Sequence, residues 1–99
     1  MKSKSSIGIG PIFQRDLFNL PKSEAGAALK TFRKISQLTW EQSGQDQGLK
    51  WEKINSKKGQ KGENLYSFII RQKYRAIAAR EGDYLRILSL HSDYAIAYQ

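Results

Sequence analysis

Near the C-terminal end of the sequence, three residues have side chains that together can cleave a phosphodiester bond. His91 ends the last predicted strand, Tyr94 follows it, and Arg75 lies on the strand predicted to pair with that one. An imidazole transfers protons near neutral pH, and a guanidinium stabilises the charge of a pentavalent phosphate. RNA suits this chemistry, because its 2′-OH attacks the adjacent phosphate once deprotonated. The residues permit RNA cleavage without requiring it, since a lone strand-end histidine also has structural uses.

Composition argues against most other catalytic chemistry. The 99 residues include no Cys and a single His, so we expect no disulfide framework, no thiolate nucleophile and no cysteine- or histidine-built metal site. The Gly-Ile-Gly of residues 8–10 is too short for a dinucleotide-binding loop. We therefore expect neither a metal nor a cofactor. No apolar run approaches the ~18 residues of a membrane span, so we expect a cytoplasmic protein without membrane contact.

Positive charge is concentrated in the middle of the sequence. The chain has 17 basic and 9 acidic residues, a net charge of 17 − 9 = +8. Residues 50–75 hold two acids, Glu52 and Glu63, and so contribute 8 − 2 = +6 through the basic residues Lys50, Lys53, Lys57, Lys58, Lys61, Arg71, Lys73 and Arg75. This clustering favours a polyanionic partner, either nucleic acid or the ribosome. An acidic protein partner and a merely solvated face are the alternatives.

Apolar spacing predicts two helices early in the chain. Phe13, Leu17 and Leu20 recur at helical intervals and predict a short helix that ends before Pro21. A longer helix is predicted by the apolar stripe of Ala25, Ala28, Leu29, Phe32, Ile35 and Leu38. Residues 43–48 are polar and Gly-rich, and predict a loop. Two helices joined at a proline indicate a helical hairpin.

The remaining segments predict a small sheet. Alternating residues indicate a short strand at 49–52, and a polar stretch at 55–64 indicates a mobile basic loop. Further strands are predicted at residues 65–70, 74–80 and 84–90, the last two joined by a tight turn at 81–83, and a weak edge strand at 7–10. We thus expect one α+β domain, a helical hairpin packed on a small antiparallel sheet, over residues 7–99. Residues 1–6 are expected to form a flexible basic tail.

Several short motifs in this order resemble the RelE/ParE superfamily of bacterial toxin–antitoxin toxins over residues 7–98. They resemble the family's P-x-F-x-x-D-L at residues 11–17, L-P at 20–21, G-L-x-x-x-K-L at 48–54 (with Ile54 in place of the final Leu), L-Y-S at 65–67, Y-R-A-I at 74–77 and an H-x-D ending with A-Y at 91–98. The resemblance implies two helices against a small antiparallel sheet. This agrees with the layout that the apolar spacing predicts.

The resemblance also implies an activity. RelE-like members cut mRNA in the ribosomal A site without a metal and leave a 2′,3′-cyclic phosphate. By resemblance Arg75 stabilises transition-state charge, while His91 or Tyr98 completes the acid–base pair. The residues expected to bind RNA are Lys50, Lys53, Arg71 and Lys73. The structural alternatives are an ion pair or strand-face role for Arg75, protection of sheet edges by the lysines, and a packing anchor for Tyr98.

Two departures from the family pattern leave other functions open. Tyr94-Ala95 stands where the family ending often has His-Asp, and Ile69 stands where many members carry an Arg. These changes favour a ParE-like protein that inhibits DNA gyrase without catalysis, or a non-toxic member that only binds a partner. In either toxin interpretation we expect a cognate antitoxin of acidic composition that covers the basic face.

Overall fold

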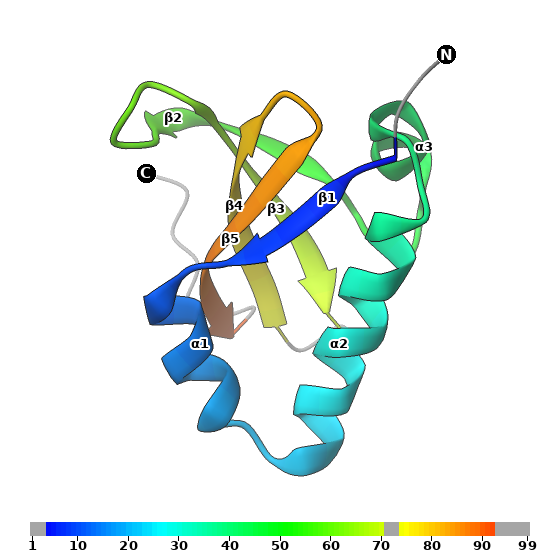
Figure 1. The fold of residues 1–99 in the computed structure, drawn as a ribbon, viewed down its shortest axis with the longest axis vertical. Coiled ribbons are helices and arrows are strands. Elements are labelled where there is room, and N and C mark those ends of the chain that lie inside the picture. Colours follow the sequence, from blue (N-terminus) through cyan, green and yellow to red (C-terminus); the bar gives the residue numbers. More distant parts are fainter. Residues whose placement is uncertain (1–3, 71–73, 93–99) are drawn as a thin grey trace.

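The computed structural model describes residues 4–70 and 74–92, which form an α+β fold. A sheet of five strands in the order β1-β5-β4-β3-β2 packs against the helices (Figure 1). The elements in chain order are β1 (Ser6–Ile9), α1 (Pro11–Phe18), α2 (Lys22–Ser36), α3 (Trp40–Gln45), β2 (Glu52–Lys58), β3 (Asn64–Ile70), β4 (Tyr74–Glu81) and β5 (Tyr84–Ser92). The expected α+β class and helical hairpin are confirmed.

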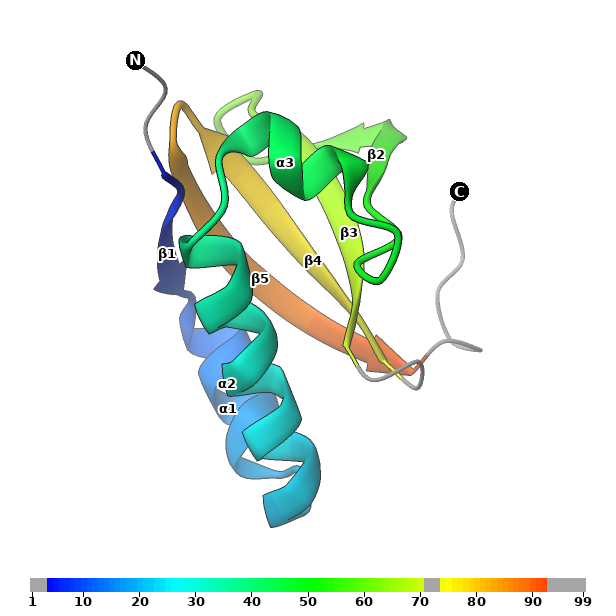
Figure 2. The same ribbon diagram turned by 90° about the vertical axis from the view of Figure 1, so that its right-hand side faces the viewer.

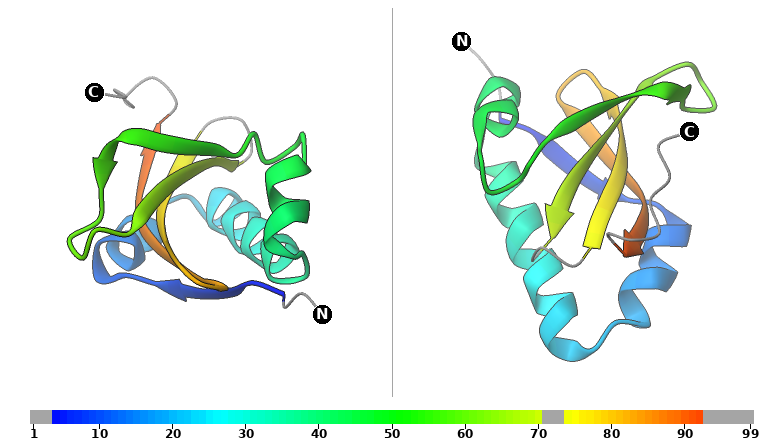
Figure 3. Two further views of the ribbon diagram at one scale, coloured as in Figure 1. Left: turned by 90° about the horizontal axis from the view of Figure 1, so that it is seen from above. Right: turned by 180° about the vertical axis from the view of Figure 1, so that it is seen from behind.

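The sheet is mixed, which the sequence did not predict. Strands β2 to β5 form the expected antiparallel meander, but β1 joins β5 in parallel, with Ser6 opposite Tyr84. β1 and β2 therefore form the two edges (Figure 3). Gly82 has a φ of +62° in the turn between β4 and β5, a left-handed conformation that glycine adopts at low cost.

The main core lies between the helices and one face of the sheet (Figure 2). An aromatic series crosses it, with ring centroids 5.3 Å apart for Phe13 and Phe32 and 6.3 Å apart for Phe32 and Phe68. Phe68 then stacks on Trp51 at 5.3 Å with an interplanar angle of 11°. Both predicted helices thus contribute to one core through their apolar stripes. None of the helices within the described residues is long and apolar enough to cross a membrane.

The predicted loop at 43–48 is wrong at its start, because residues 43–45 are the last turn of α3. This helix begins with a capping box: the Gln42 backbone N–H donates to Thr39 Oγ1 at 3.3 Å, and the Thr39 N–H donates to Gln42 Oε1 at 2.9 Å. The Thr-x-x-Gln spacing of residues 39–42 is the sequence signature of a capping box. Helix α3 has few residues and an interrupted apolar pattern, so periodicity alone does not detect it.

The strand predicted at 49–52 and the loop predicted at 55–64 are also corrected. Lys50 has a φ of 46°, which turns the chain before the strand, and β2 begins only at Glu52. The strand then continues to Lys58, so that only residues 59–63 form the loop. Ile54 is the one buried residue of β2. An edge strand this polar has the composition of a loop, which explains the error.

Residues 4–6, which were expected to belong to a flexible tail, make backbone contacts with the rest of the fold. The Ser5 backbone N–H donates to Leu38 O at 3.1 Å, and that of Ser6 donates to Asp83 O at 2.8 Å. Lys4 forms a bridge with Thr39. The start of β1 is therefore tied to the segment after α2 and to the β4–β5 turn. Residues 1–3 lie outside the described residues.

Glu63 fastens the β2–β3 loop to β5. Its carboxylate accepts the Lys61 backbone N–H at 2.8 Å and lies 3.2 Å from Arg86 Nη2, and its side chain is 7% exposed. Backbone hydrogen bonds, above all its own and that of Lys61, lower the pKa of Glu63 below the ordinary value of 4.5, and the charge of Arg86 adds to this. The ionised form is thus favoured by folding.

Phe68→Ala is expected to lower the free energy of unfolding by about 3–5 kcal/mol, because it removes a fully buried ring from the centre of the aromatic series. Phe18→Ala is the matched control, since Phe18 is 76% exposed, and a change within about 0.5 kcal/mol is expected there. Urea unfolding followed by tryptophan fluorescence measures both. Equal effects of the two variants would contradict the core described here.

Glu63→Gln is expected to lower stability at neutral pH and to matter progressively less in acid. A carboxyl group with a lowered pKa stabilises the fold above its unfolded pKa, and this contribution disappears as the pH falls through the folded-state pKa. Urea unfolding midpoints of the two proteins should therefore converge as the pH is lowered from neutral through the acid range. Parallel midpoint curves over that range would show that Glu63 does not make this contribution.

Candidate functional site

Arg75 and His91 lie next to each other on the sheet face turned away from the helices. Arg75 of β4 pairs with His91 of β5 on one side and with Ile69 of β3 on the other. Directly opposite residues of neighbouring strands point to the same face. The three side chains therefore form a row across the sheet, which we call the Arg75 row (Ile69, Arg75 and His91). The predicted pairing of the Arg75 and His91 strands is confirmed.

Arg75 is held by contacts from the segment that leads into β2. Its Nη2 lies 3.3 Å from Glu52 Oε1 and donates a hydrogen bond to the Lys50 carbonyl oxygen, also at 3.3 Å. The Arg75 side chain is 8% exposed, whereas that of Glu52 is 56% exposed. The ion pair proposed as an alternative role for Arg75 is thus present. Its acidic partner lies at the surface, where it can move into solvent.

His91 has a fixed neighbour in Ser89, two residues earlier on β5. The distance between His91 Nε2 and Ser89 Oγ is 2.9 Å, within hydrogen-bonding range. A hydrogen bond at one ring nitrogen restricts the ring orientation and leaves Nδ1 as the second proton-transfer position. Ser89 did not emerge from the sequence analysis. The signal for it was the i, i+2 spacing, which places both side chains on one face of a strand.

The predicted lysines occupy different places. Lys50 is exposed, and its carbonyl group faces Arg75. Lys53 pairs with Tyr66, whose ring packs against Trp40 on the helix side. Since neighbours along a strand point to opposite faces, Lys53 lies on the face opposite to Glu52 and the Arg75 row. The structure therefore brings Lys50 close to Arg75 but not Lys53. Arg71, Lys73 and Tyr98 lie outside the described residues.

The segment 46–50, which presents the Lys50 carbonyl to Arg75, is anchored at both ends. Asp46 Oδ1 accepts the Leu49 backbone N–H at 3.1 Å and lies 3.0 Å from Lys34 Nζ of α2. The hydrogen bond from Lys34 is the main reason that the pKa of Asp46 is lowered. The Ile69 N–H donates to Leu49 O at 2.8 Å. Helix α2 and strand β3 therefore both fix the segment beside Arg75.

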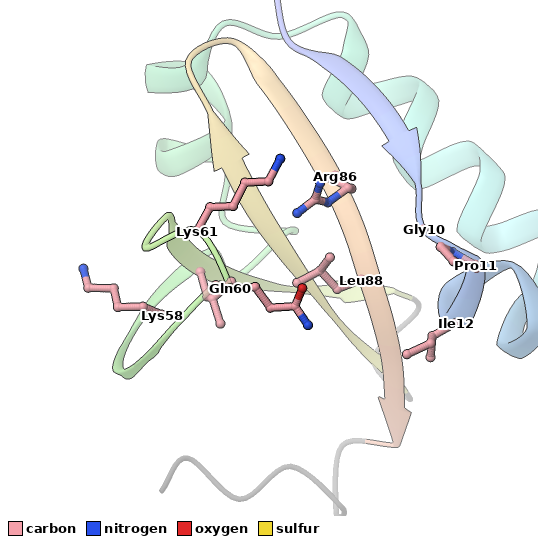
Figure 4. Close-up of a pocket in the computed structure, with 10 residues that line it drawn as sticks. Gly10, Pro11, Ile12, Lys58, Gln60, Lys61, Arg86 and Leu88 are labelled. Carbon is pink, nitrogen blue, oxygen red and sulfur yellow. The ribbon is translucent and has the colours of Figure 1, made fainter.

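A cavity of about 510 Å³ opens on the same sheet face, between β5, the β2–β3 loop and the start of α1 (Figure 4). Its lining residues are Gly10, Pro11, Ile12, Lys58, Gly59, Gln60, Lys61, Leu65, Arg86 and Leu88. Leu65 and Leu88 belong to the small apolar cluster on this face, together with Ile54, Ile77 and Ala79. The cavity and the Arg75 row thus share a face but occupy different parts of it.

Solved structures with a similar fold span nearly the whole chain. An archaeal RelE–RelB complex from Pyrococcus horikoshii superposes with a TM-score of 0.68 and 21% identity, covering 94% of this chain and 99% of that one. The YoeB dimer from Staphylococcus aureus gives 0.62 and 16%, over 93% of this chain and 100% of that one. A copper-bound mutant toxin from Helicobacter pylori gives 0.52 and 18%, over 94% and 99%.

Sequence comparison adds no closer relative. No protein-family model and no curated protein sequence matches the chain. At the identities given above, the likeness to the solved structures concerns the fold. It agrees with the arrangement that the motifs at residues 11–17, 65–67 and 74–77 imply by resemblance. The chain therefore adopts the fold of the RelE-like toxins of toxin–antitoxin systems.

Proposed function

We propose that the protein is the toxin of a type II toxin–antitoxin system and that it cleaves mRNA at the ribosome. The observation that carries this proposal is the Arg75 row, in which a guanidinium and an imidazole lie side by side on the sheet face turned away from the helices. The RelE-like fold and the net charge of +8 support it. A positive net charge suits a polyanionic substrate such as RNA.

The proposed reaction is an attack of the RNA 2′-OH on the adjacent phosphorus. His91 removes the proton of the 2′-OH, a bond forms between the 2′ oxygen and phosphorus, and the bond from phosphorus to the 5′ oxygen breaks. The leaving 5′ oxygen takes up a proton from an acid, for which Tyr98 is the candidate. The products are a 2′,3′-cyclic phosphate and a 5′-OH end. Arg75 stabilises the extra negative charge of the pentavalent phosphate.

For Arg75 to act in this way, the Glu52 carboxylate must move away from the guanidinium. Its carboxylate lies at the guanidinium where a substrate phosphate would bind, since both are oxyanions that pair with arginine. Because the Glu52 side chain is more than half exposed, moving it into solvent costs little. The exposed Lys50, whose carbonyl group contacts Arg75, is an additional cation for a neighbouring phosphate. In this proposal Glu52 holds the guanidinium in place until RNA displaces the carboxylate.

A second candidate function is inhibition of DNA gyrase by binding, as in ParE-like proteins. Ile69 favours it, because this side chain adds no charge to the Arg75 row. By the family resemblance, many RelE-like members carry an arginine at this position. The ion pair with Glu52 also favours it, since a purely structural Arg75 would have this contact. A binding function needs the surface of the protein and not a reactive row.

Arg75→Ala is expected to abolish cuts within translated codons when the toxin is induced in a bacterial host, as read by mapping mRNA 5′ ends. Loss of a transition-state charge partner lowers cleavage by about 10²–10³-fold. Glu52→Gln should keep or raise cleavage, because it frees the guanidinium while preserving the shape of its partner. Arg33→Ala on the exposed side of α2 is the matched control and should cut like the wild type.

Folding of each purified variant is checked by thermal unfolding, which separates lost chemistry from lost structure. A folded Arg75→Ala protein that still cuts mRNA would contradict the assigned role. If Arg75→Ala and Glu52→Gln lose stability and activity together, Arg75 is a structural residue. Growth arrest with intact messages and inhibited gyrase supercoiling would replace the nuclease by the second candidate.

We further propose an acidic antitoxin as the partner, supported by the net charge and by the likeness to an RelE–RelB complex. The product of a neighbouring gene is expected to co-purify with the toxin and to suppress its effect on growth. Because the attraction is electrostatic, the complex should weaken as salt is raised, by an amount that size-exclusion chromatography at several salt concentrations measures. If no such product binds or suppresses, the antitoxin proposal fails.

A further inference from the structure

Strand β5 loses one of its two neighbours partway along its length. Within the described residues, β1 pairs with β5 only as far as Ile87, which lies opposite Ile9. The Gly10 N–H donates to Ile87 O at 2.8 Å where the chain leaves the sheet. From Leu88 on, helix α1 takes the place of β1 beside β5 (Figure 1). The stretch of β5 that carries His91 therefore depends on α1 for a partner on this edge.

A bulge in β5 sets the face on which His91 lies. Ile77 of β4 lies opposite Ser89, whereas the following residue of β4 lies opposite Ile87. Leu88 is therefore an extra residue, and it packs like Ile77 against the small apolar cluster on the face turned away from the helices. Because side chains alternate along a strand, β5 without this bulge would turn His91 toward the helices. The direction of the imidazole thus depends on how the stretch after the bulge is held.

Asp16 of α1 provides a hydrogen-bond acceptor to this stretch. Its Oδ2 accepts the Leu90 backbone N–H at 3.3 Å, and its side chain is 24% exposed. The peptide unit that contains this N–H lies between Ser89 and His91, whose side chains are 2.9 Å apart at Oγ and Nε2. A hydrogen bond to a carboxylate is stronger than one between neutral groups. Holding this peptide unit fixes the directions in which both side chains leave the strand.

The position of Asp16 is unfavourable for α1 itself. The helix ends at Phe18, so Asp16 lies in the last turn, where the negative end of the helix dipole disfavours a carboxylate. Aspartate is also a poor helix former. Arg15 Nη2 lies 3.5 Å from Asp16 Oδ1, but its side chain is 70% exposed and such pairs contribute little. A residue that its own helix disfavours is typical of a role elsewhere in the fold, and the contact with Leu90 is such a role.

We propose that Asp16 is a positioning residue for His91, acting through the backbone of β5. The effect on cleavage rests on the proposed function, because it requires His91 to be the base, whereas the link between Asp16 and the imidazole does not. Without the carboxylate the end of β5 loosens, and the imidazole meets the 2′-OH less often in the reactive geometry. Since a displacement of about 1 Å can cost 10²-fold in rate, the loss should be about tenfold to hundredfold.

The kinetic test follows cleavage of an mRNA held in purified ribosomes over a range of concentrations of the whole protein. Asp16→Ala should lower the maximal rate at least about tenfold and leave the half-saturating concentration unchanged, because binding of RNA is not affected. Asp16→Asn should restore most of the rate, since its side-chain oxygen can still accept the Leu90 N–H. The matched control is Asp83→Ala, an exposed acid in the turn at the other end of β5, which should cleave like the wild type.

The second test needs no activity. His91 is the single histidine of the chain, so the imidazole signals in an NMR spectrum belong to it. In a neutral ring held by Ser89 the two ring nitrogens differ in ¹⁵N shift, and in Asp16→Ala these shifts should approach each other as the ring reorients. The Leu90 amide should exchange with solvent about tenfold faster, because its acceptor is lost. Exchange at Phe68 in the core should not change.

Unchanged ring shifts and Leu90 exchange in Asp16→Ala overturn the proposal, whether or not the protein cleaves mRNA. Faster exchange at Phe68 and Leu90 alike also overturns it, because Asp16 then stabilises the whole fold. A displaced ring with wild-type cleavage removes the role in the reaction. Changed ring shifts in a protein whose wild type leaves mRNA intact support the link from Asp16 to His91 and contradict the proposed nuclease instead.

Discussion

The register of β4 between its two neighbours is the constraint on which the rest of the molecule depends. On one face of this strand Ala76 and Ala78 are fully buried against the helices, and on the other Arg75 and Ile77 face the opposite side of the sheet. Side chains alternate along a strand, so a shift of one residue would exchange the two faces. The guanidinium would then meet the aromatic core. The apolar pattern that forms the core therefore also fixes where the candidate chemistry lies.

Core and candidate site are further joined by the segment 46–50. Trp51 stacks on Phe68 in the core, while the Lys50 carbonyl, one residue earlier, accepts a hydrogen bond from Arg75. Asp46 ties the start of this segment to α2. A rotation of α2 therefore moves the oxygen that orients Arg75. The site is positioned by the packing of the helices although it lies on the far side of the sheet.

How much the sequence predicts depends on the strength of each local pattern. The two main helices and the last three strands were predicted because their apolar residues recur at a regular period. β2 was predicted too short because Ile54 is its one buried residue. The sequence identified Arg75 and His91 through their strands, but not Glu52 as an ion-pair partner or the face on which Lys53 lies. Those features depend on register and on a left-handed residue at Lys50, which no local pattern signals.

The parallel pairing of β1 with β5 has a consequence for biosynthesis. Ser6 pairs with Tyr84, a separation of 84 − 6 = 78 residues, so β1 has no partner until β5 has left the ribosome. Contacts this distant in sequence form late, because the intervening chain must first be closed into a loop. The α1–α2 hairpin leaves the ribosome earlier, before strands β2 to β5 of the sheet on which it packs. Because β5 supplies His91, Arg86 and Leu88, a nascent chain has neither the Arg75 row nor the cavity beside β5, and both arise together when β5 is added.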